Sequence, residues 1–222
     1  MDKMLYENYK KILEAELLPA LGCTEPGAIA YAAAQARILL GDMPDSIELW
    51  CSGNIVKNVK GVIVPNSGGM RGIEAAACLG VLAGGKSDIC DLEVLSSVES
   101  SDIEEAQRLL SQGFCLCHLK EDTPNLYIKV SAKAEGHEAQ ITVKDGHTNI
   151  TSKILDGGSV IQFRKQARNL KIRNSLSVKE ILNLPMLSRK MTAKHLPLKW
   201  RPYRYRRRGL CRDYGAKVGR RF

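Results

Sequence analysis

The residues with the clearest chemical potential lie near the N-terminus, where a thiol, a hydroxyl and a carboxylate follow one another at Cys23, Thr24 and Glu25. Thr24 is predicted to be the N-cap of a helix, with Glu25 and Pro26 in first-turn positions that suit them. The Ala-rich sequence up to Leu40 contains no helix breaker, which places Cys23 at the mouth of that helix. The partial positive charge there favours a thiolate, as nucleophile or metal ligand. The alternative is a small buried residue in a helix-entry turn.

A second candidate is the glycine-rich loop from Pro65 to Gly72, which leads into an Ala/Gly-rich helix predicted over residues 73–83. Free backbone amides at that helix start, with Arg71 nearby, suit an anion such as a substrate carboxylate. The loop has neither the Gly-Lys-Ser/Thr ending of a Walker loop nor the GxGxxG pattern. A flexible connector before a close-packed helix is the competing interpretation. The central residues of the loop are Asn66, Ser67, Gly68 and Gly69.

The other cysteines favour packing over ligation. Seven cysteines without a CxxC pair give no local zinc-ribbon or ferredoxin pattern. Cys51 and Cys78 fall in apolar stretches and are predicted core residues. Cys115 and Cys117 alternate with Leu116 as in a strand, which puts both thiols on one face and favours core packing over metal binding.

The elements that would position these residues begin with an amphipathic helix over residues 3–18, which Pro19 ends. Residues 47–51 alternate as a short strand, whereas 52–59 could be a strand end or a helix start. A capping box at Ser101 and Glu104 is expected to open a further amphipathic helix that ends at Gly113.

Residues 126–134, 139–143 and 148–155 alternate as three strands of a β-meander, with turns at Glu135-Gly136 and Asp145-Gly146. One polar face indicates an antiparallel sheet backed by helices on its other side. The fold class is therefore predicted as α+β, with Ala/Gly-rich helices packed on an antiparallel meander. After Gly158 the chain is predicted to lean to helix as far as Leu184. From there an irregular tail is expected.

Composition changes abruptly near Pro185. Residues 187–222 hold 13 Lys and Arg against one acid, whereas the rest of the chain has 20 basic and 23 acidic residues, a net charge of −3. Aromatic and Arg residues interleave around Trp200, which is one signature of a nucleic-acid arm. The other interpretation is a shifted reading frame over residues 185–208, because Trp200–Arg208 can be encoded so that the neighbouring frame reads as an acidic helix.

Three separated blocks, GCTEPGAIAYAAA, SGNIVKNVKGVIVPNSGGMRGIEAAACLG and LEVLSSV, resemble the L-cysteine desulfidase family, which carries the serine dehydratase alpha-chain domain. The resemblance covers residues 5–183, and Gly209–Gly219 looks like a further stretch of that family. It implies a frame lost near Pro185 and recovered near Gly209. It also implies that about half of the usual family length is missing.

The resemblance implies an enzyme that converts L-cysteine to pyruvate, ammonia and sulfide, or dehydrates L-serine, with a [4Fe–4S] cluster and no pyridoxal phosphate. Cys23 would be one of three cysteine ligands, and the other two would lie outside this chain. The open iron would act as a Lewis acid. Asn66 to Gly69 would receive the substrate carboxylate. Lys57 and Glu25 are the candidate bases for the α-proton.

These interpretations give residues 1–184 as the N-terminal part of a catalytic domain and 185–222 as a basic tail. No apolar run reaches transmembrane length and no signal-peptide core is present, so a cytoplasmic protein without membrane contacts is expected. The expected partner is a small amino acid substrate, with homo-oligomerisation left open. Nucleic acid is not the expected partner, but binding through the Arg-rich tail remains the alternative function. A third hypothesis is a cysteine-nucleophile enzyme built on Cys23.

Overall fold

A computed structural model describes residues 3–16, 20–86, 92–162 and 176–182. The chain divides into two compact units, one formed by Ala20–Ala167 and the other by Met1–Pro19 with Arg168–Phe222. The larger unit contains the helices α2 (Thr24–Leu40), α3 (Gly53–Val59), α4 (Ile73–Gly84) and α5 (Ser100–Ser111) and the short 3-10 helix η1 (Val94–Ser97). Its strands are β1 (Ser46–Cys51), β2 (Cys115–Leu119), β3 (Tyr127–Ala134), β4 (His137–Lys144), β5 (Ile150–Leu155) and β6 (Gly158–Gln162).

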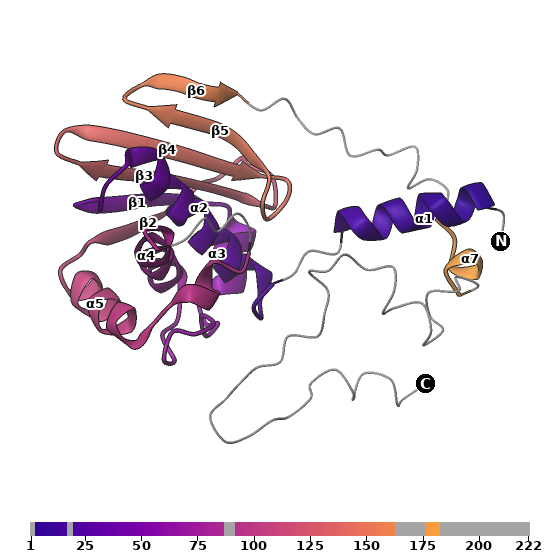
Figure 1. Ribbon diagram of the computed structural model, residues 1–222, viewed down its shortest axis with the longest axis horizontal. Coiled ribbons are helices and arrows are strands. Elements are labelled where there is room, and N and C mark those ends of the chain that lie inside the picture. Colours follow the sequence, from indigo (N-terminus) through magenta and orange to yellow (C-terminus); the bar gives the residue numbers. More distant parts are fainter. Residues whose placement is uncertain (1–2, 17–19, 87–91, 163–175, 183–222) are drawn as a thin grey trace. The chain divides into compact units, whose positions relative to one another are not determined.

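The strands form one six-stranded sheet in the order β2-β1-β3-β4-β5-β6 (Figure 1). The predicted meander is confirmed as β3, β4 and β5, which pair antiparallel in chain order. β1 joins its edge antiparallel to β3, and β2 pairs with β1 in parallel. The predicted α+β class is therefore confirmed, with a sheet that is mainly antiparallel.

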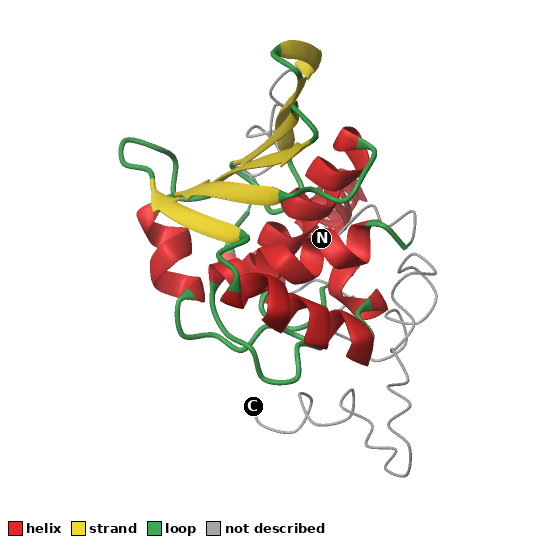
Figure 2. Cartoon of the chain, turned by 90° about the vertical axis from the view of Figure 1, so that its left-hand side faces the viewer, coloured by secondary structure: helices red, strands yellow, loops and turns green. Residues whose placement is uncertain are grey.

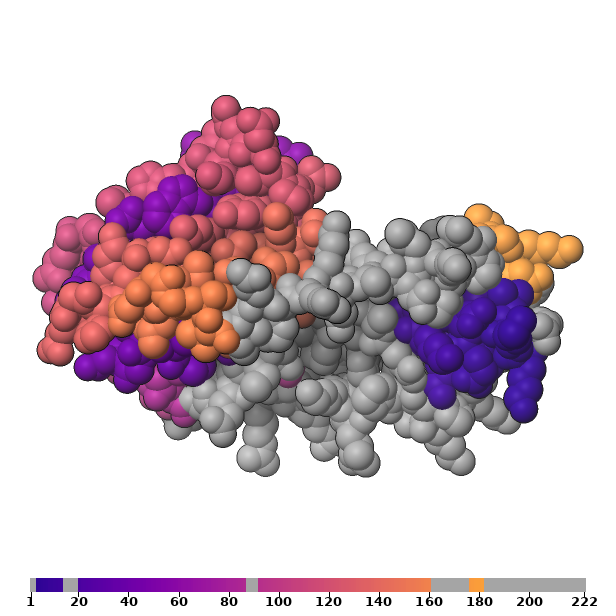
Figure 3. All heavy atoms as spheres, turned by 90° about the horizontal axis from the view of Figure 1, so that it is seen from above, coloured from indigo at the N-terminus to yellow at the C-terminus, as the bar shows by residue number. Residues whose placement is uncertain are grey.

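The stretch after Asp156 differs from its prediction. Residues 158–162 form β6, which pairs antiparallel with β5, in place of the start of a helical segment. Asp156 and Gly157 have φ values of 49° and 78°, the left-handed pair that a two-residue hairpin turn requires. Val160 is 52% exposed on this hairpin, which forms part of the surface in Figure 3. An Asp-Gly pair between short apolar runs was thus a hairpin signal, and the expectation of helix directly after Gly158 is wrong for the residues of β6, although Val178–Leu182 of the same predicted segment is helical.

Helices α2 and α4 pack against each other through small residues. A Cβ atom added at Gly80 would lie 2.3 Å from the Ala30 carbonyl oxygen, and one at Gly84 would lie 2.7 Å from the Ala34 Cα. The contacts advance four residues along both helices, so the two helices run in the same direction where they touch. Their N-termini therefore lie at the same end of the unit, which matters for the candidate site.

The core lies between this helix pair and one face of the sheet. Ile47, Leu49 and Cys51 of β1 are 1%, 0% and 0% exposed, as their alternation predicts. Helix α2 packs on β3 and β4, and α4 packs on β2. Figure 2 shows the sheet in yellow above the helices that cover this face. The ambiguous stretch after Cys51 is a helix, because Ile55 and Val59 lie one turn apart and are both buried.

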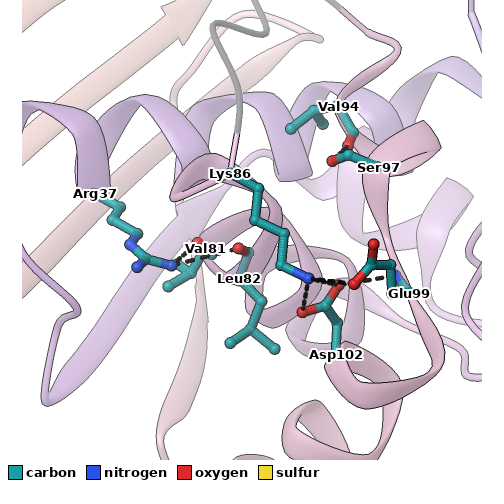
Figure 4. Close-up of polar contacts among 8 residues, drawn as sticks. All are labelled: Arg37, Val81, Leu82, Lys86, Val94, Ser97, Glu99 and Asp102. Atoms are coloured by element: carbon teal, nitrogen blue, oxygen red, sulfur yellow. Dashed lines mark hydrogen bonds and ion pairs between the residues drawn. The ribbon is translucent and has the colours of Figure 1, made fainter.

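Helix α5 begins at Ser100, two residues earlier than a Ser101 N-cap would allow. Its N-cap is Glu99, and Glu99 forms the capping box with Asp102 at N3. The Asp102 carboxylate accepts the Glu99 backbone N–H at 2.8 Å, and Lys86 Nζ reaches both carboxylates at 3.1 and 2.8 Å (Figure 4). The predicted box at Ser101 is therefore wrong, because carboxylates paired with a lysine cap this end in place of a hydroxyl.

The second unit contributes α1 (Lys3–Glu16) and α7 (Val178–Leu182). The predicted N-terminal helix is confirmed, with Tyr9 3% exposed and its hydroxyl accepting the Ser177 backbone N–H at 2.9 Å. The predicted boundary at residues 184 and 185, the basic tail and the proposed frame-shifted segment lie outside the described residues. Among the helices that are described, none combines the length and the apolarity needed to cross a bilayer.

Candidate functional site

Cys23 stands at the start of α2, one position nearer to the helix than predicted. It is the N-cap residue itself, with extended backbone angles of φ −65° and ψ 132°, and Thr24 is the first helical residue. The assignment of Thr24 as N-cap is therefore wrong. No side chain caps this helix end, because the Cys23 thiol turns instead to the Glu25 carboxylate, with its Sγ 3.1 Å from Oε2.

Glu25 is the centre of a small polar cluster. Its Oε2 accepts hydrogen bonds from the Cys23 thiol and, at 3.1 Å, from the Thr24 hydroxyl. Its Oε1 accepts the side-chain amide of Asn58 in α3, with Nδ2 at 3.2 Å. Burial by itself would raise the pKa of Glu25, but the hydrogen bond from Cys23 and those from its other neighbours lower that pKa below its ordinary value. Glu25 is therefore a carboxylate at neutral pH.

The Cys23 thiol has the opposite tendency. Burial and the hydrogen bond to Glu25 raise the pKa of Cys23 above its ordinary value. The expectation that the helix end alone would favour a thiolate is thus wrong for this arrangement, because the full charge of a carboxylate 3.1 Å away opposes the partial charge of the helix end. The pair is a neutral thiol that donates to an ionised carboxylate.

The glycine-rich loop lies beside this cluster. A Cβ atom added at Gly22 would lie 3.2 Å from Pro65 Cγ, so the two segments are in close contact. The loop folds back on itself through a hydrogen bond from the Val64 N–H to the Met70 carbonyl at 2.9 Å. Its reversal uses positive φ values of 56°, 67° and 100° at Asn66, Gly68 and Gly69. Because α2 and α4 run in the same direction, both helix N-termini face this loop region.

The side chains of the loop are already engaged. Asn66 Nδ2 donates to the Leu95 carbonyl at 3.0 Å, and the Ser67 hydroxyl, with the residue 1% exposed, donates to the Met70 carbonyl at 3.1 Å. Arg71 is exposed and donates to the Gly61 carbonyl. Gly68 and Gly69 are exposed, and a Cβ atom at Gly69 would meet nothing within 4 Å. What the loop offers to a ligand is therefore its backbone at the two glycines.

Lys57 does not join the cluster. It is exposed on α3, and its side chain takes part in no hydrogen bond or ion pair with the described residues. Its neighbour Asn58 is the residue that reaches Glu25, and sequence reasoning did not single it out. The sequence offered one indication of its role: Asn58 is an amide within the second block that resembles the desulfidase family, three positions after the buried Ile55.

Of the four cysteines predicted to pack in the core, three are buried and one is half-buried. Cys51 and Cys78 are both 0% exposed and Cys115 is 6% exposed, while Cys117 is half-buried on the same face of β2. Burial raises the pKa of the Cys78 thiol to about 12. The described residues contain no group of three His, Cys, Asp or Glu side chains placed to hold a metal ion. The described part of the chain therefore does not supply the ligand set of a whole [4Fe–4S] cluster. Cys90 and Cys211 lie outside the described residues.

Comparison with known proteins finds relatives that are named UPF0597 proteins. One from Finegoldia magna is 47% identical over 158 residues, which cover 71% of this chain and 37% of that protein. One from Treponema denticola is 41% identical over 189 residues, 82% of this chain and 43% of that protein. No family profile matches the chain.

A third relative extends the alignment further. The UPF0597 protein of Desulfitobacterium hafniense is 36% identical over 221 residues, which cover 97% of this chain and 51% of that protein. The alignment thus reaches into the basic tail, since only about seven residues of the chain are left outside it. The chain spans about half of this relative and less of the other two. The names of these relatives state neither a substrate nor a reaction.

Proposed function

We propose that the cluster around Cys23 and Glu25 is part of the active site of a cytoplasmic lyase that removes the β-substituent of a small amino acid. L-cysteine would give pyruvate, ammonia and hydrogen sulfide, and L-serine would give pyruvate and ammonia. The proposal rests on the resemblance of three sequence blocks to L-cysteine desulfidases, together with the geometry that joins those blocks.

The observation that carries the proposal is that the three blocks meet at one end of the fold. Glu25 of the first block accepts a hydrogen bond from Asn58 of the second block. The side-chain amide of Asn66, in the second block, donates a hydrogen bond to the backbone carbonyl of Leu95, in the third block, at 3.0 Å. Ligand sites are typically formed where polar groups from segments distant in the sequence converge.

The arrangement suits the first part of a β-elimination. The reaction needs a base for the α-proton and a site for the substrate carboxylate. Glu25 is ionised and half-buried, which is the state that a base needs, so we assign this role to Glu25 rather than to the exposed Lys57. The backbone of Gly68 and Gly69, next to the N-terminus of α4, is the proposed carboxylate site.

The balance of the reaction is simple. The base takes the α-proton, the Cβ–S bond breaks with both electrons on sulfur, and the resulting enamine tautomerises and is hydrolysed to pyruvate and ammonia. Cys23 can provide one thiolate to an iron–sulfur cluster. The other thiolates would have to come from outside the described residues.

Sulfide release tests the proposal. We expect the longer Finegoldia magna relative, prepared anaerobically with iron and sulfide, to release sulfide and pyruvate in equal amounts from L-cysteine. The 222-residue chain treated in the same way is expected to show little or no turnover. If the longer relative gives neither product from L-cysteine or L-serine, the proposed reaction is wrong. Turnover by the 222-residue chain at rates usual for enzymes would refute the idea that the reaction needs cysteine ligands from outside this chain.

A further inference from the structure

Helix α3 contributes one side chain to the candidate site from outside the Cys23 segment. Asn58 lies 33 positions from Glu25 in the chain, and its Nδ2 donates to Glu25 Oε1 at 3.2 Å. The other carboxylate oxygen, Oε2, accepts the Cys23 thiol and the Thr24 hydroxyl, both from the same turn as Glu25. The two oxygens of one carboxylate are therefore held by different elements.

This division controls the rotation of the carboxylate. The terminal torsion of a glutamate is broad and roughly two-fold, so a carboxylate bonded at one oxygen only can turn between orientations. The hydrogen bond of Asn58 to Oε1 leaves Oε2 as the oxygen that faces Cys23. A donor from a second element is needed, because Cys23 and Thr24 lie within the same turn and move with Glu25.

The position of Asn58 is itself well determined. Ile55 and Val59, on the same helix, are 1% and 0% exposed and anchor α3 in the core. Asn58 is half-buried and reaches Glu25 at the start of α2, whereas the neighbouring Lys57 is exposed to solvent. The rigid core thus sets where the amide lies, as a supporting residue for a reactive pair requires.

We infer that Asn58 is a positioning residue, whose amide orients the Glu25 carboxylate so that one oxygen faces the Cys23 thiol. Its importance for elimination rests on the proposed function, whereas the orientation itself can be measured without turnover. The hydrogen bond of its side-chain amide goes to the Glu25 carboxylate and not to the Cys23 thiol. It acts through Glu25.

Alkylation of Cys23 by iodoacetamide tests the inference in the full 222-residue chain. The rate at the Cys23 peptide is followed by mass spectrometry as a function of pH, so the other thiols need not be removed. Glu25→Gln removes the neighbouring charge and is expected to move the alkylation profile of Cys23 to lower pH. A downward shift of the Cys23 profile by one pH unit should raise the alkylation rate at neutral pH about threefold. The thiolate population rises about tenfold, but a thiolate of lower pKa is a weaker nucleophile.

Asn58→Leu should reproduce at least half of the shift caused by Glu25→Gln, because the carboxylate is no longer held on the thiol. The double variant should show no more than the Glu25→Gln shift, since both changes remove the same interaction. Asn58→Ser, which is too short to reach Glu25, should behave as Asn58→Leu does and serves if the leucine variant does not fold. Asn54→Leu, one turn away on α3 and exposed, is the matched control and should leave the profile unchanged.

Two results would overturn the inference. One is a wild-type alkylation profile in the Asn58 variants together with a shifted profile in Glu25→Gln. This result would show that the Glu25 carboxylate holds its orientation without Asn58. The other is a shift that adds fully to that of Glu25→Gln, which would place the effect of Asn58 directly on Cys23. Failure of the longer relative to release sulfide would refute the lyase but leave this measurement standing.

Discussion

At the residue scale, the protonation states of the site follow from one contact. A cysteine at a helix N-terminus is usually a candidate thiolate. Here burial and the hydrogen bond that the thiol donates to the Glu25 carboxylate raise the pKa of Cys23, and the same hydrogen bond lowers the pKa of Glu25. The same two residues suggested the site from sequence, yet the direction of the Cys23 pKa shift is the reverse of what the helix end alone implies.

The His137–Asp156 pair gives a pH prediction of the same kind. His137 Nδ1 donates a hydrogen bond to the Asp156 carboxylate at 2.8 Å, and this bond raises the pKa of the exposed imidazole. The folded state therefore favours protonated His137, and the stability gained is fully present below about pH 6.5 and is lost as the pH rises through the higher folded pKa. Asp156→Asn should lower the His137 pKa in an NMR titration.

Asp122→Asn is the control for this titration, because Asp122 also has a positive φ but belongs to a different loop. It should leave the His137 resonances unchanged. An unaltered His137 pKa in Asp156→Asn would show that the pair has no measurable coupling in solution.

At the element scale, the candidate site depends on how closely α2 and α4 approach. Gly80 and Gly84 of α4 meet Ala30 and Ala34 of α2, so no side chain beyond a methyl group separates the two backbones. Arg37 reinforces the far end by donating to the carbonyls of Val81, at 2.8 Å, and Leu82 (Figure 4). This packing sets the two helix N-termini side by side.

Gly80→Ala tests the helix contact. The added methyl group would lie 2.3 Å from the Ala30 carbonyl oxygen, so the helices must separate. Overpacking of this kind costs about 1–3 kcal/mol of unfolding free energy. Urea denaturation should show a lower midpoint with an unchanged m value. Gly61→Ala, where a Cβ atom meets nothing within 4 Å, should be close to neutral; equal midpoints for the two variants would contradict the predicted clash.

At the scale of the whole molecule, the folded core belongs to one part of the chain. Apart from Tyr9, the buried hydrophobic residues that the structure describes lie between Ala28 and Ile150. The larger unit, Ala20–Ala167, contains all six strands of the sheet. Residues 187–222 contribute 13 of the 33 Lys and Arg residues of the chain.

Because the sequence predicts an irregular, basic tail, deletion of residues 189–222 is expected to leave the far-UV circular dichroism and the unfolding midpoint unchanged. A chain that ends at Leu155 also loses β6 and should be less stable, which makes it the positive control. A marked loss of stability on deleting the tail alone would show that it packs on the core. If the full chain binds RNA in a salt-dependent way and the deletion variant does not, the nucleic-acid alternative gains support.

The sequence by itself determined the elements whose signals are local. Strand alternation identified β1 and the meander β3 to β5, helical periodicity identified α1, and the Ala-rich composition identified α2 and α4. It also brought out Cys23, Glu25 and the glycine-rich loop as candidates. These succeed because side-chain periodicity and turn residues act over a few neighbouring positions.

Only the tertiary structure decided which of these residues meet. The parallel pairing of β2 with β1, the hydrogen bond of Asn58 to Glu25 and the contact of Gly22 with Pro65 join segments far apart in the chain. The protonation of Cys23 likewise depends on where one carboxylate lies in space. Such relations follow from packing of distant elements around a common core, and no short sequence pattern encodes them.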